Sequence, residues 1–406
     1  MKIPFAPPRI DDKSIAEVVD TLKSGWITTG PKTKRFEDEI AEYTNAKAVL
    51  CLNSATAGLE LALRWFGVGP GDEVIIPAYT YCATANVVEH VGAKVVMVDV
   101  DPATANMDVE ALKRALTPNT KAVIPVDIAG YPCDYSAIKT CLADFHNVNG
   151  FKASGEQQEK LGRILLMSDA AHSFGARYMG KKIGSEVDIM VFSFHAVKNL
   201  TTAEGGAMCI NLNSSFDCAE VYKNLRTLSL HGQSKDAFNK MVPGAWRYDV
   251  AYPGYKCNMT DIQAALGLVE LSRYETETLP KRKEICQYYH DKLKGSAHYI
   301  LPDFVVEGKL ESSYHLYRLR ISGAGEKERD AIITELALKE IAVNVHFLPL
   351  PMLSYYEKKG YDICHYPEAY KCFHNEISLP VYYDLSREMQ DFLIEELTKA
   401  CQKVMG

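Results

Sequence analysis

The sequence predicts an α/β fold, with a large, mainly parallel sheet domain in residues 1–275 and a smaller C-terminal α/β domain in residues 276–406. The first observation is a series of short apolar runs, rich in Val, Ile and Met, which is typical of strands covered on both faces. The second is that helical patterns alternate with these runs, which favours parallel pairing. The expected strands are residues 48–52, 73–76, 94–98, 122–126, 164–167, 189–194 and 207–210.

The helical patterns are amphipathic stretches with apolar residues three or four positions apart. In the first, residues 14–24, one face carries Ile15, Val19 and Leu22, and Gly25 ends the run. We expect further helices at 33–43, 57–66, 83–91, 109–116, 135–145, 216–230, 259–275 and 277–294.

The C-terminal domain is expected to alternate in the same way, and Asp384 or Ser386 is expected to cap its last helix. Its predicted elements are strands at 314–321 and 342–346 and helices at 326–339 and 387–403. The polar stretch 143–163 interrupts the alternation of strands and helices. It is predicted to be a surface loop or a lid.

Composition argues against several classes of protein. Lys and Arg total 45 against 52 Asp and Glu, a net charge of −7, and no basic block suggests a nucleic-acid surface. No apolar run approaches the ~20 residues that cross a bilayer, and the first residues lack the apolar core of a signal peptide. The 11 cysteines are scattered without a CxxC pair, which argues against a metal site or disulfide framework. We expect a cytoplasmic protein that does not insert into membranes.

Two residues in the stretch 168–207 suggest chemistry. Asp169 closes one expected strand, and Lys198 follows the next one in a loop of small and polar residues. Pyridoxal 5′-phosphate (PLP) needs an amine that holds it as a Schiff base and an acid that keeps its pyridine nitrogen protonated. Taken singly, a lysine and an aspartate are more often solvated surface residues, so the surrounding sequence has to decide.

The segment after the first strand of the sheet has features of a phosphate site. Small residues at 53–58 leave backbone amides free at a helix start, where Ala55 lies between the hydroxyls of Ser54 and Thr56. Simple N-capping of the helix explains the same residues equally well. At the same sheet edge, Tyr81 is a candidate for stacking on a planar ring, or else a core aromatic.

Together these segments resemble the DegT/DnrJ/EryC1/StrS family of PLP-dependent nucleotide-sugar aminotransferases. The amino-acid sequences of residues 25–32 and 193–199 are most similar to those of one branch of the family. This branch acts on UDP-4-keto-pentoses and comprises the UDP-4-amino-4-deoxy-L-arabinose–oxoglutarate aminotransferases. One departure is Ser168, which stands where Glu commonly precedes the aspartate. The matching motifs are GWITTGPK (25–32), NSATA (53–57), GDEVI (71–75), DAAH (169–172), FSFHAVKN (192–199), EGG (204–206) and GYKCNMTD (254–261).

The resemblance implies an aspartate-aminotransferase (type I) PLP fold and a set of site residues. Lys198 would be the Schiff-base lysine that also moves a proton, and Asp169 the partner of the pyridinium nitrogen. An obligate homodimer with shared active sites follows, because the family's matching phosphate contact comes from the partner subunit. The remaining implied positions are Ser54, Ala55 and Ser193 at the phosphate, Tyr81 and Ala171 on the two ring faces, His172 near the 3-hydroxyl, and Asn258 as the partner-subunit contact.

The implied activity is transfer of the amino group of L-glutamate to a keto group, at C4, of a nucleotide-linked sugar, releasing 2-oxoglutarate. Such products serve cell-surface glycan, lipopolysaccharide or lipid A modification. Three alternatives stay open: a PLP-dependent sugar dehydratase, a 3-keto-sugar aminotransferase, and a binding or regulatory protein on the same fold. The family's dehydratases carry His at the lysine position, so Lys198 argues against the first. We expect substrate choice to depend on residues 25–31, residues 233–256 and the C-terminal domain.

Overall fold

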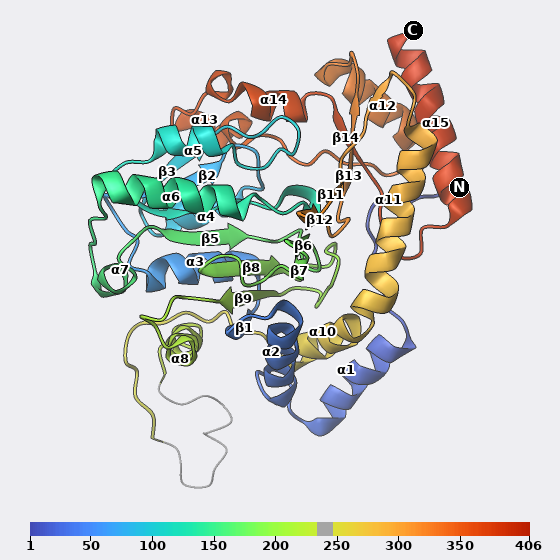
Figure 1. Ribbon diagram of the computed structural model, residues 1–406. Helices are drawn as coiled ribbons and strands as arrows, with labels where there is room; N and C mark the ends of the chain where they lie inside the picture. The colour runs from blue at the N-terminus through green and yellow to red at the C-terminus, as the bar shows by residue number, and fades with distance from the viewer. Residues whose placement is uncertain (234–246) are drawn as a thin grey trace.

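The computed structural model describes residues 1–233 and 247–406 and is built around one large sheet (Figure 1). Neighbouring strands follow the order β1-β9-β8-β5-β4-β2-β3, and β8, β5, β4, β2 and β3 pair in parallel while β9 is antiparallel to both its neighbours. The predicted α/β fold with a mainly parallel sheet is confirmed. The strands are β1 (Ala48–Leu52), β2 (Glu73–Pro77), β3 (Lys94–Val98), β4 (Thr120–Val123), β5 (Leu165–Asp169), β8 (Ile189–Ser193) and β9 (Gly206–Ile210).

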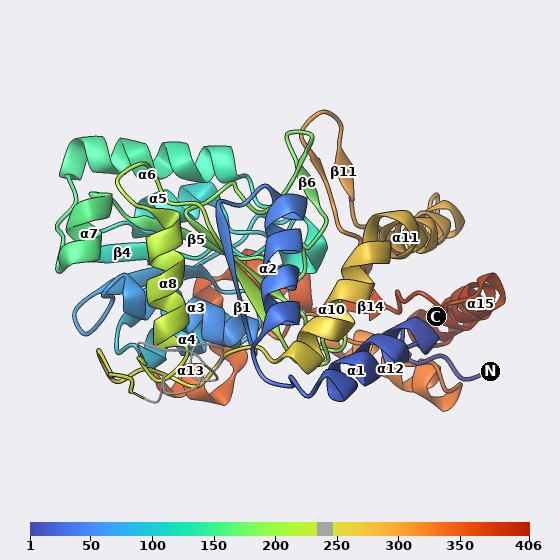
Figure 2. The same ribbon diagram turned by 90° about the horizontal axis from the view of Figure 1, so that it is seen from below.

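Helices cover both faces of the sheet, and each face has its own apolar core. Figure 2 shows α6 on one side of the strands and α3, α4 and α13 on the other. One core joins the sheet to α3 (Ala55–Trp65), α4 (Ala83–His90), α8 (Cys218–Leu228), α13 (Ser354–Lys358) and α14 (Pro367–Phe373). The other joins it to α2 (Pro31–Thr44), α5 (Val109–Ala115), α6 (Tyr135–Asn149) and α10 (Asp261–Arg273).

A third core lies in the C-terminal part of the chain and includes the fully buried Ile3 from the N-terminus. Its helices pack on a three-stranded antiparallel sheet of order β10-β13-β14. Ser386 caps the last helix by accepting a hydrogen bond from the backbone N–H of Met389, as predicted. The elements are α11 (Leu279–Leu293), β10 (Tyr299–Ile300), β13 (Tyr317–Ile321), α12 (Glu326–Leu338), β14 (Glu376–Leu379) and α15 (Arg387–Met405).

Several short elements complete the described chain. Helix α1 (Asp12–Ser24) packs along α10. A small four-stranded sheet of order β11-β12-β6-β7 joins the two halves of the sequence. The other elements are β6 (Arg177–Tyr178), β7 (Lys181–Lys182), β11 (Val305–Val306), β12 (Leu310–Glu311), α7 (Glu156–Leu161) and the single turns η1 (Ile128–Gly130), η2 (Tyr274–Thr278), η3 (Leu350–Met352) and η4 (Ile363–His365).

The predicted strand at 342–346 is wrong. Only isolated bridges form here, between Ile3 and Ile341 and between Asn344 and Ser378. The ladder to β14 stops after Asn344 because the N–H of His346 donates to the side chain of Glu376, on β14, at 2.9 Å, and not to a backbone carbonyl. This segment then runs on to η3, whose residues pack on the core of the large sheet.

The prediction of a loop or lid at 143–163 is also wrong. Helix α6 continues to Asn149, α7 follows, and the stretch supplies no residue to the cavity at the carboxyl ends of β5 and β8 that is described below. Most polar side chains of this stretch are exposed on the surface, but Gln158 is fully buried and bonds to backbone groups. The side chain of Gln158 accepts from the N–H of Ser154 at 2.9 Å and donates to the carbonyl oxygen of Gly67 at 3.2 Å.

The boundary predicted at residue 275 lies in η2, a π-helical turn between α10 and α11. Helix α10 passes through η2 into α11 without a loop. Residues 350–373, which were assigned to the C-terminal domain, contribute to the core of the large sheet. The division at 275 therefore stays a prediction about folding units. Within the described residues, none of the helices is long and apolar enough to cross a membrane.

Candidate active site

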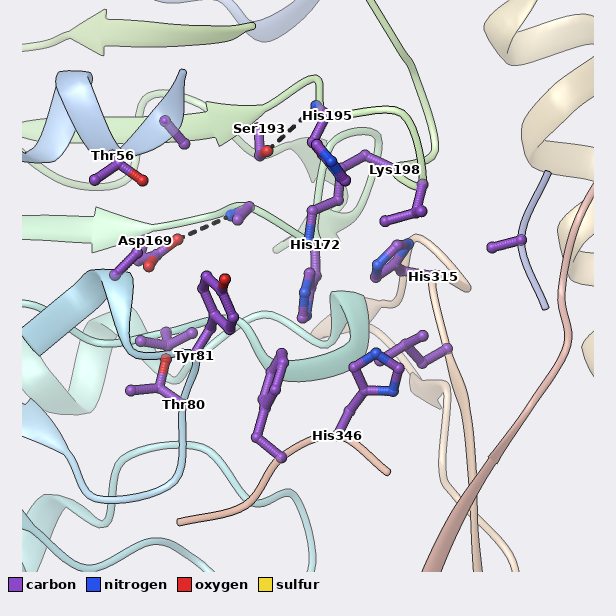
Figure 3. Close-up of a pocket in the computed structure, with 18 of the residues that line it drawn as sticks. Thr56, Thr80, Tyr81, Asp169, His172, Ser193, His195, Lys198, His315 and His346 are labelled. Atoms are coloured by element: carbon purple, nitrogen blue, oxygen red, sulfur yellow. Dashed lines mark hydrogen bonds between the residues drawn. The ribbon is translucent and has the colours of Figure 1, made fainter. Parts of the chain in front are cut away.

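A cavity of about 410 Å³ lies beyond the carboxyl ends of β5 and β8, where ligands bind in open α/β sheets (Figure 3). In Figure 3 Asp169 and Thr56 lie on one side of this pocket, and Lys198, His315 and His346 on the other. Nine of the ten predicted site residues line it: Ser54, Ala55, Thr56, Tyr81, Asp169, Ala171, His172, Ser193 and Lys198.

The start of α3 forms one end of the cavity. Ser54 is the N-cap, and its hydroxyl accepts from the N–H of Ala57 at 3.1 Å. The N–H groups of Ala55 and Thr56 precede the first intrahelical bond, so they are free to bind an anion, which the helix dipole also favours. The two interpretations of this segment are therefore compatible: Ser54 caps the helix while the backbone amides remain available.

Gly206, the first residue of β9, allows the strand to pack closely against the start of α3 at this end of the cavity. A Cβ on Gly206 would lie 2.5 Å from the backbone nitrogen of Ala55 and 2.7 Å from the carbonyl carbon of Ser54, far inside van der Waals contact. The first residue of β9 is thus packed against the first turn of α3, as a tight backbone cradle requires.

Asp169 is the buried acid of the site, with 5% of its surface exposed. Burial raises the pKa of its carboxyl group, against the hydrogen bonds from Thr84 and Ala171 and the charge of Lys198. The Thr84 hydroxyl donates to Oδ2 at 2.8 Å and the N–H of Ala171 to Oδ1 at 3.2 Å. A carboxylate this buried needs a cationic partner to stay ionised, which a pyridinium nitrogen in the cavity would supply.

Lys198 lies in the loop after β8 and is half-buried. Burial lowers the pKa of its amine to about 8, although the charge of Asp169 acts in the opposite direction. A lysine with this pKa is partly neutral near physiological pH and can act as a nucleophile or a base. The loop is held in place because Asn199, the next residue, donates to the carbonyl oxygen of Ser313 at 2.8 Å.

Tyr81 is not a core aromatic, because 59% of it is exposed. Its ring lies 5.9 Å from that of Phe347, which in turn stacks on His172 at 5.7 Å with an interplanar angle of 19°. Tyr81 and Ala171 both line the cavity, so a flat ring has an aromatic wall and a small side chain available to it.

Besides His195, which stands in a matching motif but was not predicted as a site residue, two further histidines at the cavity were missed by the sequence analysis. His315 and His346 line the pocket together with His172. Burial lowers the pKa of all three rings and the positive charge of Lys198 lowers it further, in the case of His346 to about 3. His346 ends a predicted strand, where ligand contacts are expected in such folds, whereas nothing in the sequence around His315 singles it out.

Asn258 does not line the cavity of its own chain. Its side-chain NH₂ donates to the Thr29 hydroxyl at 2.6 Å, and its Oδ1 accepts from the Lys256 amine at 2.5 Å. Its predicted role in the partner's site remains a prediction. Of residues 233–256, expected to influence substrate choice, 234–246 lie outside the described residues.

Residues 8–398 match the DegT/DnrJ/EryC1/StrS aminotransferase family. The chain belongs to this family. Among curated proteins it is similar to the spore coat polysaccharide biosynthesis protein SpsC of Bacillus subtilis, with 38% identity over 400 residues, 97% of this chain and 95% of that one. It is equally similar, at 38% identity over 100% of this chain and 98% of the relative, to the uncharacterized protein MJ1066 of Methanocaldococcus jannaschii.

Solved structures of other aminotransferases have the same fold. The putative sugar aminotransferase Spr1654 of Streptococcus pneumoniae, in its PLP form, is 48% identical, with a TM-score of 0.94 and all of both chains covered. Its PMP form is 49% identical, with a TM-score of 0.95 over 99% of this chain and 100% of that one. PseC of Helicobacter pylori, an aminotransferase involved in pseudoaminic acid biosynthesis, is 25% identical, with a TM-score of 0.85 over 99% of this chain and 100% of that one.

This DegT/DnrJ/EryC1/StrS protein is thus a PLP-dependent transaminase, and its cavity fits that cofactor. The cradle between Gly206 and the start of α3 offers free amides to a phosphate. The carboxylate of Asp169 suits a pyridinium nitrogen, and the amine of Lys198 suits a covalent bond to the aldehyde carbon. Among the residues that the structure describes, no cluster of three or more acidic, His or Cys side chains could hold a metal ion.

Proposed function

We propose that the enzyme transfers the amino group of L-glutamate to the C4 keto group of a nucleotide-linked sugar, giving 2-oxoglutarate and a 4-amino sugar nucleotide. The observation that carries this proposal is the placement of Asp169 and Lys198 on one cavity that ends at the free amides of α3. Its relatives include sugar aminotransferases and a protein of spore coat polysaccharide synthesis. A role in making cell-surface glycans is consistent with both.

PLP, when bound, withdraws electrons from the carbon that loses a proton. Asp169 would keep the pyridine nitrogen protonated, because a buried carboxylate and a cationic ring stabilise each other. Lys198 would hold the cofactor and, once released as a neutral amine, take a proton at Nζ and return it. A lysine at this position favours amino transfer over the dehydration catalysed by relatives that carry His there.

We also propose that the enzyme works as a homodimer with shared sites in the cytoplasm. Asn258, which is absent from its own cavity, would reach the partner's cofactor phosphate. The exposed apolar face of α1, formed by Ile15, Val19 and Leu22, is a surface that a second copy could cover. All 11 cysteines are unpaired, which is consistent with a reducing compartment.

The test is a panel of 4-keto and 3-keto sugars linked to UDP, dTDP and GDP, each incubated with PLP-loaded enzyme and L-glutamate. We expect 2-oxoglutarate to form with at least one 4-keto sugar nucleotide, together with an amino sugar in equal amount. Release of 2-oxoglutarate only with 3-keto sugars would overturn the C4 assignment. Absence of release with every acceptor would overturn the proposed function.

A further inference from the structure

His315 is a buried imidazole in the wall of the cavity, just before β13. It is 5% exposed and lines the pocket. Figure 3 shows it beside His172, away from Asp169, and the two ring centroids are 4.4 Å apart. This is the part of the pocket that the cofactor-binding prediction leaves unassigned. What His315 can bind depends on which of its ring nitrogens carries a proton.

Asn199 determines the position of that proton. Its NH₂ group donates to the carbonyl oxygen of Ser313 at 2.8 Å and to the hydroxyl of Tyr274 at 3.2 Å. The Tyr274 hydroxyl itself donates to the carbonyl oxygen of Phe174 at 2.6 Å, so it accepts from Asn199. A carbonyl oxygen can only accept, which fixes the amide orientation and leaves Oδ1 2.7 Å from Nδ1 of His315. Nδ1 of His315 therefore carries the proton.

The ring is also neutral. Burial lowers the pKa of His315, and the positive charges of Lys198 and Arg282 lower it further, together with the neighbouring histidines. A neutral imidazole protonated at Nδ1 has a bare lone pair at Nε2, which can only accept a hydrogen bond. Within the described residues no hydrogen bond reaches Nε2.

His172 has the opposite arrangement. Its Nδ1 accepts a hydrogen bond from the backbone N–H of Ala129 at 3.2 Å, so the neutral ring carries its proton at Nε2 and is a donor. The two adjacent rings thus present opposite hydrogen-bonding groups at Nε2, a donor on His172 and an acceptor on His315. His172 can donate to an oxyanion in the cavity, whereas His315 can bind only a group that brings its own hydrogen.

We propose that Nε2 of His315 accepts a hydrogen bond from a ring hydroxyl of the sugar, and that Asn199 is the positioning residue that makes it an acceptor. This inference rests on the proposed function. A hydroxyl can donate, but the carboxylates of glutamate, the phosphates and the keto oxygen cannot. The amino group of glutamate can also donate, but it is the group that reacts at the cofactor. One cavity must accept both substrates in turn, and His315 would favour the sugar without contributing to glutamate binding.

The experiment separates the two half-reactions of the PLP-loaded enzyme and of His315→Phe, which keeps an aromatic ring of similar size. One half-reaction is 2-oxoglutarate release from L-glutamate, and the other is amination of a UDP-linked 4-keto sugar by enzyme preloaded with PMP. We expect kcat/KM for the sugar to fall about tenfold, through KM, while glutamate is unaffected. His315→Gln, whose amide oxygen can accept, should recover part of the loss.

Analogues of the sugar that lack the 2- or 3-hydroxyl complete the test. One of them should be about tenfold poorer for the wild type and lose nothing further in His315→Phe. Asn199→Asp, which still accepts from Nδ1, should keep the preference for the full sugar over the analogue that lacks the hydroxyl. Asn199→Leu should lose that preference. Equal loss in both half-reactions, or equal loss for all analogues, would overturn the inference alone. A wild type that aminates no keto sugar nucleotide would overturn the proposed function with it.

Discussion

The hydroxyl of Thr84, on α4, donates a 2.8 Å hydrogen bond to Oδ2 of Asp169, at the end of β5. The bond lies in a buried environment, where burial alone favours the protonated acid. Thr84 therefore helps Asp169 to remain a carboxylate that can pair with a pyridinium nitrogen. The prediction of Asp169 as the acid of the site did not include this partner, which lies 85 residues away in the sequence.

Thr84→Val tests this contact with a side chain of nearly the same shape. Hydrogen bonds to charged groups contribute about 1.5–3 kcal/mol, so PLP should bind about tenfold to a hundredfold more weakly. Fluorescence titration of cofactor-free enzyme with PLP measures the effect. Thr140→Val on α6, remote from the cavity, is the matched control and should bind as the wild type does. Unchanged affinity in Thr84→Val would show that the bond does not support the cofactor.

The pKa of Lys198 predicts a pH dependence. Burial lowers it from 10.5 to about 8, so the neutral amine becomes abundant as the pH rises through about 8. Covalent capture of PLP by cofactor-free enzyme should therefore accelerate with pH and level off above that value. Between 8 and 10.5 the unfolded chain holds more protons than the folded one, so this lysine also makes folding more favourable as pH rises there. Stopped-flow absorbance at a series of pH values measures capture, and a midpoint near 10.5 would contradict the account.

Gly206→Ala tests the phosphate cradle. The added Cβ would meet backbone atoms of Ser54 and Ala55 at 2.7 and 2.5 Å, and those atoms cannot move without displacing α3. We expect PLP affinity to fall at least about tenfold, while the chain still folds. Gly155→Ala is the matched control, since nothing lies within 4 Å of its Cβ position. Equal PLP affinity in the two variants would show that the backbone between Gly206 and the start of α3 does not bind the cofactor phosphate.

The shared site predicts complementation between two inactive variants. Lys198→Ala removes the amine from one chain, and Asn258→Ala removes the proposed contact to the partner's phosphate. A mixed dimer has one site that lacks both residues and one that is intact. An equal mixture refolded together should recover about a quarter of wild-type activity if subunits assort at random. Activity no greater than the sum of the two separate variants would mean that each chain completes its own site.

The strands and the residues at their ends were predictable because parallel strands read as continuous apolar runs. This placed Asp169 and Lys198 near each other, and it placed Ser54 and Tyr81 at the same edge. The cofactor half of the pocket thus followed from local patterns and the family resemblance. The structure adds that nine of the ten predicted residues line one cavity.

The part of the pocket around His315 and His346 could not be predicted, because its side chains meet through long-range contacts. Asn199 and His315 are 116 residues apart, and no local pattern links them. His346 sits in a segment that resembles a strand in sequence but turns toward the pocket after a single bridge. The polar stretch 143–163 was predicted as a loop because exposed helices can be as polar as loops; the structure places it in the end of α6 and in α7.

In the proposed mechanism, amino transfer depends on the amine of Lys198, which would hold the cofactor and move a proton. Purified Lys198→Ala, incubated with PLP and L-glutamate, should lack the visible absorbance of covalently held cofactor and should form no 2-oxoglutarate, whereas the wild type shows both. Retained absorbance and wild-type 2-oxoglutarate formation in the variant would contradict the account.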